Sequence, residues 1–132
     1  MKDFCLKSIG KVESCYQDKF GTPRQPGLVK QSWAKIHLYQ EWQPEQALQG
    51  LEDFSYLWVL FVFHKNKKEF ENEGRYHAKV HPHRLGGKKM GVFATRSPHR
   101  PNTIGLSFVK IEKIESDGVV VSGIDLVNGT PV

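Results

Sequence analysis

A loop in the second half of the chain concentrates side chains that can bind an anion. Between residues 91 and 102 the chain presents Arg96, His99 and Arg100 together with a serine and an asparagine. Two prolines in the same stretch restrict its backbone. Rigid loops with several hydrogen-bond donors suit anionic or nucleotide-like ligands. The alternative is a tight connection whose arginines pair with carboxylates elsewhere in the chain.

Two further segments have the same character. Residues 21–27, GTPRQPG, place Arg24 and Gln25 between prolines that fix the direction of both side chains. Near the other end, Asp125 follows a β-rich run, where a carboxylate can accept hydrogen bonds from ribose hydroxyls or from an amine. The alternatives are a plain turn for the first segment and a turn cap for Asp125.

The distribution of charge points to a polyanionic partner. The formal net charge is +5, and none of the fourteen acidic residues falls between residues 74 and 110. That segment carries eight cations and four histidines, and Lys79, Lys88, Lys89 and Arg100 are our candidates for phosphate contact. Such asymmetry is typical of proteins that bind nucleic acid. The alternative is an ordinary solvated basic face.

Several other classes of site are not supported. The chain has no P-loop, no G-x-G-x-x-G and no G-x-S-x-G motif. His77, His81 and His83 lie close together but have no accompanying cysteine or carboxylate, so we expect no metal. The longest apolar run, residues 56–63, is too short to span a membrane, and the first residues lack the apolar region of a signal peptide. We therefore expect a cytoplasmic protein without a membrane segment.

Short β-strands must position these residues. Alternating or continuous apolar runs predict strands near residues 6–15, 27–38, 55–64, 76–81, 90–95, 108–114 and 119–126. Helix formers after Pro44 predict one short helix over residues 44–49. The continuous run at residues 55–64 predicts a central strand covered on both faces. The sequence thus predicts an all-β, β-dominated fold: a single domain over residues 1–132, built as a small closed barrel of six to seven strands with one short helix.

Six segments, in order along nearly the whole chain, carry a family resemblance. They are KFGTPRQPG (19–27), GLEDFS (50–55) with the run ending at His64, RLGG (84–87), GVFATRSPHRPN (91–102), IGLS (104–107) and DLVNGTPV (125–132). Together they resemble the TrmO family, also described as YaeB-like or TsaA-like, of tRNA adenosine N6-methyltransferases.

The resemblance implies a β-barrel that binds S-adenosylmethionine, usually as a homodimer. The implied reaction is methylation of N6 of N6-threonylcarbamoyladenosine at position 37, next to the anticodon of tRNA. The implied cofactor contacts, carried over by motif position, are Pro23, Arg24, Gln25, His64, Lys65, Arg96, Leu106, Asp125, Leu126, Val127 and Asn128.

The chain departs from the family pattern in three places. Thr103 stands where the family usually has proline, and Asn128 stands where it often has aspartate. Family members also continue beyond the GTPV sequence, so the resemblance implies that a C-terminal continuation is absent.

The sequence leaves the catalytic residue and the class of function open. N6 in a urea group is a poor nucleophile, so a proton acceptor is expected, with His64, His99 and Asp125 as candidates. Arg96 and Arg100 suit the threonyl carboxylate or a phosphate. Two alternatives to the enzyme are a non-catalytic β-barrel module that binds tRNA or nucleotide, and a sensor that binds only S-adenosylmethionine.

Overall fold

The computed structural model describes residues 3–15, 32–63, 76–82 and 88–132. These residues belong to two compact units. The first comprises Met1–Phe61 with Leu106–Val132, and the second comprises Val62–Gly105.

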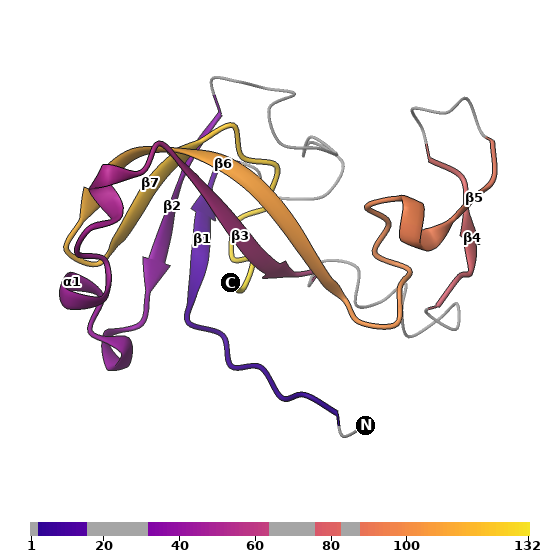
Figure 1. The fold of residues 1–132 in the computed structure, drawn as a ribbon, viewed down its shortest axis with the longest axis horizontal. Helices are drawn as coiled ribbons and strands as arrows, with labels where there is room; N and C mark the ends of the chain where they lie inside the picture. The colour runs from indigo at the N-terminus through magenta and orange to yellow at the C-terminus, as the bar shows by residue number, and fades with distance from the viewer. Residues whose placement is uncertain (1–2, 16–31, 64–75, 83–87) are drawn as a thin grey trace. The chain divides into compact units, whose positions relative to one another are not determined.

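The first unit is built on a five-stranded antiparallel sheet. Its strand order is β1-β2-β7-β6-β3, and the sheet curves into an open half-barrel (Figure 1). β6 and β7 form the predicted hairpin, with a bulge between Ile111 and Lys113 that helps to bend β6. The five strands are β1 (Gly10–Ser14), β2 (Trp33–Leu38), β3 (Tyr56–Val62), β6 (Ile104–Glu115) and β7 (Gly118–Ser122).

The expected closed barrel is therefore wrong for the strands that the structure describes, although the β-dominated class is confirmed. β1 and β3 are the two outer strands of the order and do not pair with each other. The end of the chain lies along β1 instead, with Ile9 N donating to Val132 O at 2.8 Å and Val12 N to Thr130 O at 2.9 Å. The two remaining strands form a sheet of their own and do not extend the large one.

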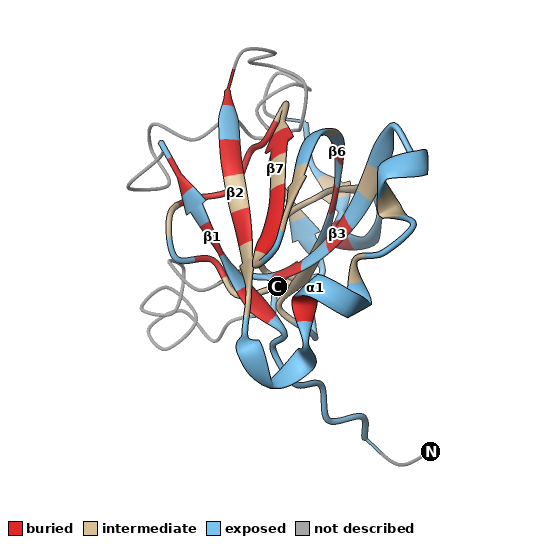
Figure 2. Ribbon diagram, turned by 90° about the vertical axis from the view of Figure 1, so that its left-hand side faces the viewer, coloured by how far each residue is buried: buried red, intermediate tan, exposed pale blue. Residues whose placement is uncertain are grey.

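Alternation along the strands builds the core. Val12, Ile36, Val109 and Val121 point to one face and are at most 4% exposed, while their neighbours along each strand face the other way (Figure 2). Gly123, at φ 73°, ends β7 earlier than the apolar pattern predicted. The residues after it still pack inside the sheet, and Ile124, Leu126 and Val127 complete the core.

β3 corrects the expectation drawn from the apolar run at residues 55–64. It is the last strand of the sheet and not a central one. Its inner residues Val59 and Phe61 are buried, whereas Trp58 and Leu60 are more than 60% exposed. The periodicity was hidden because the outward-facing residues of this strand are apolar as well, which removes the usual contrast between the two faces.

Short helical turns connect β2 to β3. They are the 3-10 helices Gln40–Trp42 and Leu51–Asp53 and the helix α1 (Pro44–Ala47), which begins at Pro44 as predicted. No helix among the described residues is long and apolar enough to cross a membrane.

The second unit contains a small sheet and a loop. β4 (Lys79–Val80) pairs with β5 (Met90–Gly91) in antiparallel fashion. The strand expected over residues 90–95 is shorter than predicted, because Val92–Ala94 forms a 3-10 turn that redirects the chain into the proline-containing loop.

Candidate functional site

Asp125 lies just beyond β7 and is held from β6. Its side chain is 7% exposed, and its Oδ1 accepts a 2.8 Å hydrogen bond from the hydroxyl of Ser107, which is fully buried. Ser107 points inward because it alternates with outward-facing Leu106 and Phe108 along the strand. A carboxylate has lone pairs for about four hydrogen bonds, and this contact fixes the orientation of the side chain.

The residues that follow Asp125 are fixed against β1. Asn128 Oδ1 accepts a 3.0 Å bond from Ser14 N, and Gly129 N donates to Val12 O at 2.6 Å. Gly129 has φ 87°, a conformation that glycine adopts without strain, and the turn closes with Thr130 Oγ1 donating to Val127 O at 2.7 Å. These hydrogen bonds fix the backbone of residues 125–130, which carry the Asp125 carboxylate and the Asn128 amide. We call this segment the ledge.

Three of the predicted cofactor contacts, Leu106, Leu126 and Val127, cannot use their side chains beside Asp125. The side chains of Leu126 and Val127 belong to the core, so they can meet a ligand only through their backbone atoms. Leu106 is 45% exposed and points to the face of the sheet opposite Ser107. The structure therefore does not bring the Leu106 and Asp125 side chains together, and a Leu106 contact would also need the backbone.

In the second unit, hydroxyl groups shape the proline-containing loop. Thr95 Oγ1 donates to Val92 O at 2.8 Å and accepts from Ser97 N at 3.1 Å. Ser97 Oγ in turn accepts from His99 N at 3.2 Å. Thr95 was not among the predicted site residues, although threonine hydroxyls commonly bond the backbone two residues further on in loops and turns.

Arg100 is part of this loop's own framework. Its Nη1 donates to the carbonyls of Thr95 and Ser97, both at 3.1 Å. A guanidinium has five N–H donors, so the remaining nitrogens keep the capacity to meet a phosphate. Arg96 is half-buried on the same loop.

His99, a residue of this loop, packs against His77. The rings of His77 and His99 are stacked with centroids 4.4 Å apart and planes 11° apart, and His77 N donates to His99 O at 3.0 Å. His99 is thus fixed in position by both its ring and its backbone. In the described part of the chain, no three His, Cys, Asp or Glu side chains gather as metal ligands would.

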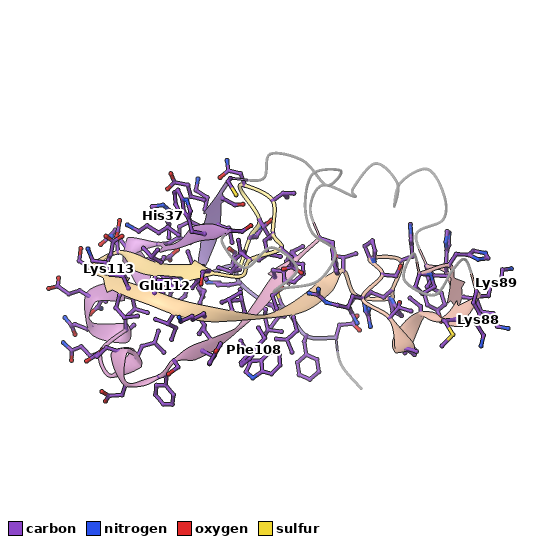
Figure 3. All side chains as sticks on the ribbon, turned by 90° about the horizontal axis from the view of Figure 1, so that it is seen from above. His37, Lys88, Lys89, Phe108, Glu112 and Lys113 are labelled. Carbon is purple, nitrogen blue, oxygen red and sulfur yellow. The ribbon has the colours of Figure 1, made fainter. Side chains whose placement is uncertain are left out.

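The three candidate lysines are exposed on the small sheet. Lys79 pairs with Gly91 across the strands, and Lys88 and Lys89 directly precede β5, where they lie together (Figure 3).

The predicted site residues are divided between the two units. The ledge residues belong to the first unit, and Arg96, His99, Arg100 and the lysines belong to the second. Five candidates fall outside the described residues: Pro23, Arg24, Gln25, His64 and Lys65.

An ion-pair network that the sequence analysis did not anticipate occupies the polar part of the large sheet. Lys35 Nζ contacts Asp117 Oδ1 at 2.6 Å and Glu115 Oε1 at 2.9 Å. The hydrogen bond to Asp117 is the main reason that the pKa of Lys35 is raised, and the bond from Lys35 lowers the pKa of both carboxylates. His37, on the same strand, contacts Glu13 and lies 3.8 Å from Asp117.

Comparisons with known proteins agree on one family. A family model described as the tRNA-methyltransferase O N-terminal domain matches residues 11–132. The chain is 53% identical over 126 residues to a tRNA (adenine(37)-N6)-methyltransferase of Rattus norvegicus, which covers 94% of this chain and 28% of the relative. It is 46% identical over 137 residues to the protein of the same name from Escherichia coli strain K12, which covers all of this chain and 56% of that one.

Solved structures are similar over the same region. A crystal structure of TrmO superposes with a TM-score of 0.76 and 36% identity, covering 98% of this chain and 54% of the other. The chain is also 40% identical over 109 residues to a probable S-adenosyl-L-methionine-binding protein of Methanocaldococcus jannaschii, covering 80% of this chain and 82% of that protein. This chain thus spans about half the length of the E. coli relative and of the solved structure.

Proposed function

This chain belongs to the family of tRNA-methyltransferase O N-terminal domains, and from that premise we propose that it is an S-adenosylmethionine-dependent tRNA methyltransferase. The substrate is N6 of N6-threonylcarbamoyladenosine at position 37, the protein acts as a homodimer, and the reaction takes place in the cytoplasm. The observation that carries the proposal is the family match over residues 11–132, which includes both the ledge of the first unit and the proline-containing loop of the second.

The donor set of the ledge fits S-adenosylmethionine. This ligand presents an ammonium group and ribose hydroxyls, all of which donate hydrogen bonds, and the ledge offers the Asp125 carboxylate beside the Asn128 amide. Ser107 on β6 and Ser14 on β1 hold these two side chains, so little ordering is needed on binding. Asp125 is therefore the anchor that we assign to the ligand.

The contribution of the chain to the reaction is positioning. S-adenosylmethionine supplies a methyl group on a positively charged sulfur. The protein has to hold N6 of the substrate in line with that methyl group, which is catalysis by orientation. A group that accepts the N6 proton is also required, and His99 is a fixed candidate because its ring stacks on His77. His64 and Asp125 remain alternatives for this role.

Arg96 is the residue that we assign to the threonyl carboxylate of the substrate. A guanidinium can bind a carboxylate with two parallel hydrogen bonds, which fixes orientation as well as position. Arg100 uses Nη1 to hold the loop that carries Arg96, so it acts partly as a support and partly as a phosphate contact.

Two measurements test the proposal. Calorimetric titration should detect micromolar binding of S-adenosylmethionine to the 132-residue chain, and a methylation assay on tRNA that carries threonylcarbamoyladenosine should detect transfer. Arg96→Ala should abolish transfer while the melting temperature is retained. Lys113→Ala removes the same charge from an exposed site, 70% open to solvent, and should be fully active. An Arg96→Ala protein with the parent's rate and melting temperature would exclude the role of Arg96.

The second candidate is a non-catalytic module that binds tRNA or nucleotide. The exposed lysines Lys79, Lys88 and Lys89 favour it, since surface cations bind phosphates without any catalytic apparatus. It predicts salt-sensitive tRNA binding without methyl transfer, whereas a bare sensor would bind S-adenosylmethionine without any effect of tRNA. The same titration and assay therefore separate the three functions.

A further inference from the structure

The outer side of β3 and β6 carries a contiguous group of uncovered apolar side chains. Tyr56, Trp58 and Leu60 on β3 are 53%, 63% and 61% exposed, and Phe108 on β6 is 43% exposed. We call these four residues the aromatic face. Phe108 lies where β6 runs alongside β3 (Figure 3), and its ring centroid is 4.6 Å from that of Trp58 and 5.0 Å from that of Tyr56.

These side chains are not needed for the core of the sheet. The residues between them, Val59 on β3 and Ser107 and Val109 on β6, point inward and are at most 5% exposed. An antiparallel sheet with one face in water ordinarily alternates apolar residues with polar ones. Here β3 is apolar on both faces, so packing among the described residues of the sheet does not account for its outer residues.

Near the β6–β7 turn the outer side is polar, because Lys35 on β2 forms ion pairs there with Glu115 and Asp117. Single exposed apolar residues are common, but a contiguous apolar group beside a polar surface is typical of an interaction site. The sheet is therefore divided into a solvated part and a part suited to contact.

Composition identifies the kind of partner. Centres of homodimer interfaces are rich in aromatic residues and poor in charge. From Tyr56 to Val62 the chain has no charged residue, and the cation next to Phe108 on the outer side, Lys110, lies 3.9 Å from Glu112. An RNA site would need cations between the rings to contact phosphates. A two-fold interface, in contrast, brings each patch against its own copy, which an uncharged patch tolerates without repulsion.

The size of the aromatic face is also suitable. A buried aromatic side chain contributes about 150–250 Å², so four apolar residues about half exposed offer on the order of 400 Å². A standard interface buries about 800 Å² on each partner, with an apolar centre and a polar rim. The face can therefore supply the centre of such an interface.

We propose that two copies of this chain pair through the aromatic face, with Trp58 and Phe108 at the centre of a two-fold interface. The inference rests on the homodimer named in the proposed function and assigns its surface. Residues at the centre of an interface contribute most of its free energy, so truncation or charge at Trp58 should be far more damaging than at the rim.

The test is sedimentation velocity of the 132-residue chain over a range of concentrations. The parent should sediment at twice its 15.1 kDa mass. Trp58→Glu should raise the dimer dissociation constant at least about 30-fold, the loss expected for a hot spot of 2 kcal/mol or more. Trp33→Glu is the matched control, because Trp33 is 55% exposed and lies on β2, outside the aromatic face. Phe108→Ser and Trp58→Ser repeat the test without added charge, should Trp58→Glu fail to fold.

The possible results separate the interface from the enzyme. A Trp58→Glu protein that dimerises as strongly as the parent overturns the inference and leaves the methyltransferase proposal standing. A parent that is monomeric at all concentrations overturns both the interface and the homodimer. Loss of tRNA binding in Trp58→Glu, with no change in mass, would assign the face to RNA and overturn the inference.

Discussion

The hydroxyl of Ser107 donates a 2.8 Å hydrogen bond to Oδ1 of Asp125, and both side chains are buried. The bond joins β6 to the segment after β7, eighteen residues further along the chain. It therefore links the strand that carries Phe108 on its outer side with the carboxylate that we assign to S-adenosylmethionine. A buried charge needs such a donor, because leaving one unsatisfied is costly.

Ser107→Ala should destabilise the protein and weaken ligand binding. The Asp125 carboxylate would lose a donor in a buried site, which costs about 1.5–3 kcal/mol in the free energy of unfolding. Urea denaturation measures this loss, and calorimetry measures the affinity for S-adenosylmethionine. Ser122→Ala is the matched control, since Ser122 also donates to a carboxylate, Glu112, but at an exposed site. Equal effects of the two substitutions would contradict the structural role of Ser107.

The sequence predicted a carboxylate at a strand end, and Asp125 does follow β7, but the residue that supports it was not predictable. Asp125 was recognised as a carboxylate after a strand, whereas Ser107 carries no local signal that it faces Asp125. The strands were also predicted, yet the position of β3 at the edge of the sheet was not, because its outward residues are as apolar as its inward ones. Pairing order depends on contacts between distant segments, which periodicity does not encode.

The close approach of β7 to β2 makes Gly118 hard to replace. A Cβ at Gly118 would lie 2.0 Å from the backbone oxygen of Ile36, so one of the paired strands would have to move. Gly118→Ala should lower the free energy of unfolding by about 3 kcal/mol. Gly91→Ala is the control, because an added Cβ there meets no atom within 4 Å. Comparable urea midpoints for the two variants would contradict the pairing of β2 with β7.

The Lys35 network should make stability depend on pH. The pKa values of Glu115 and Asp117 are lowered from ordinary values of 4.5 and 3.8, chiefly by their bonds to Lys35. The stabilisation is therefore present above those ordinary values and is lost as the pH falls through the lowered ones. The pKa of Lys35 is raised from 10.5, so its contribution is present below pH 10.5 and is lost as the pH rises through the raised value.

Lys35→Met tests this dependence. Between about pH 5 and pH 10 the variant should be less stable than the parent, and the difference should shrink at pH 3, which lies below the ordinary pKa values of both carboxylates. Thermal denaturation at several pH values measures the effect. Lys113→Met is the control, since Lys113 reaches Glu115 only at 3.8 Å and is 70% exposed. A difference for Lys35→Met that is the same at pH 3 and pH 7 would exclude the ion pairs as its cause.

Asn128→Asp should strengthen binding of S-adenosylmethionine without loss of stability. The carboxylate can still accept the 3.0 Å bond from Ser14 N, because either oxygen of aspartate replaces the amide oxygen. A charged acceptor binds an ammonium group more strongly than an amide does, and about 1 kcal/mol corresponds to a severalfold gain in affinity. Gln49→Glu, the same change at an exposed position after α1, should leave affinity unchanged. Weaker binding by Asn128→Asp would place the ligand's amine elsewhere.

The lysines of the small sheet should determine how tRNA binding depends on salt. Lys88 and Lys89 are both exposed, and each phosphate contact contributes about 0.7–0.9 to the slope of log affinity against log salt. The double variant Lys88→Ala/Lys89→Ala should therefore weaken tRNA binding and reduce the slope by about 1.4–1.8, as measured by filter binding between 50 and 200 mM salt. Lys11→Ala/Lys113→Ala removes the same charge from exposed sites on the large sheet. If the control reduces the slope as much as the test variant, net charge binds tRNA and the small sheet has no special role.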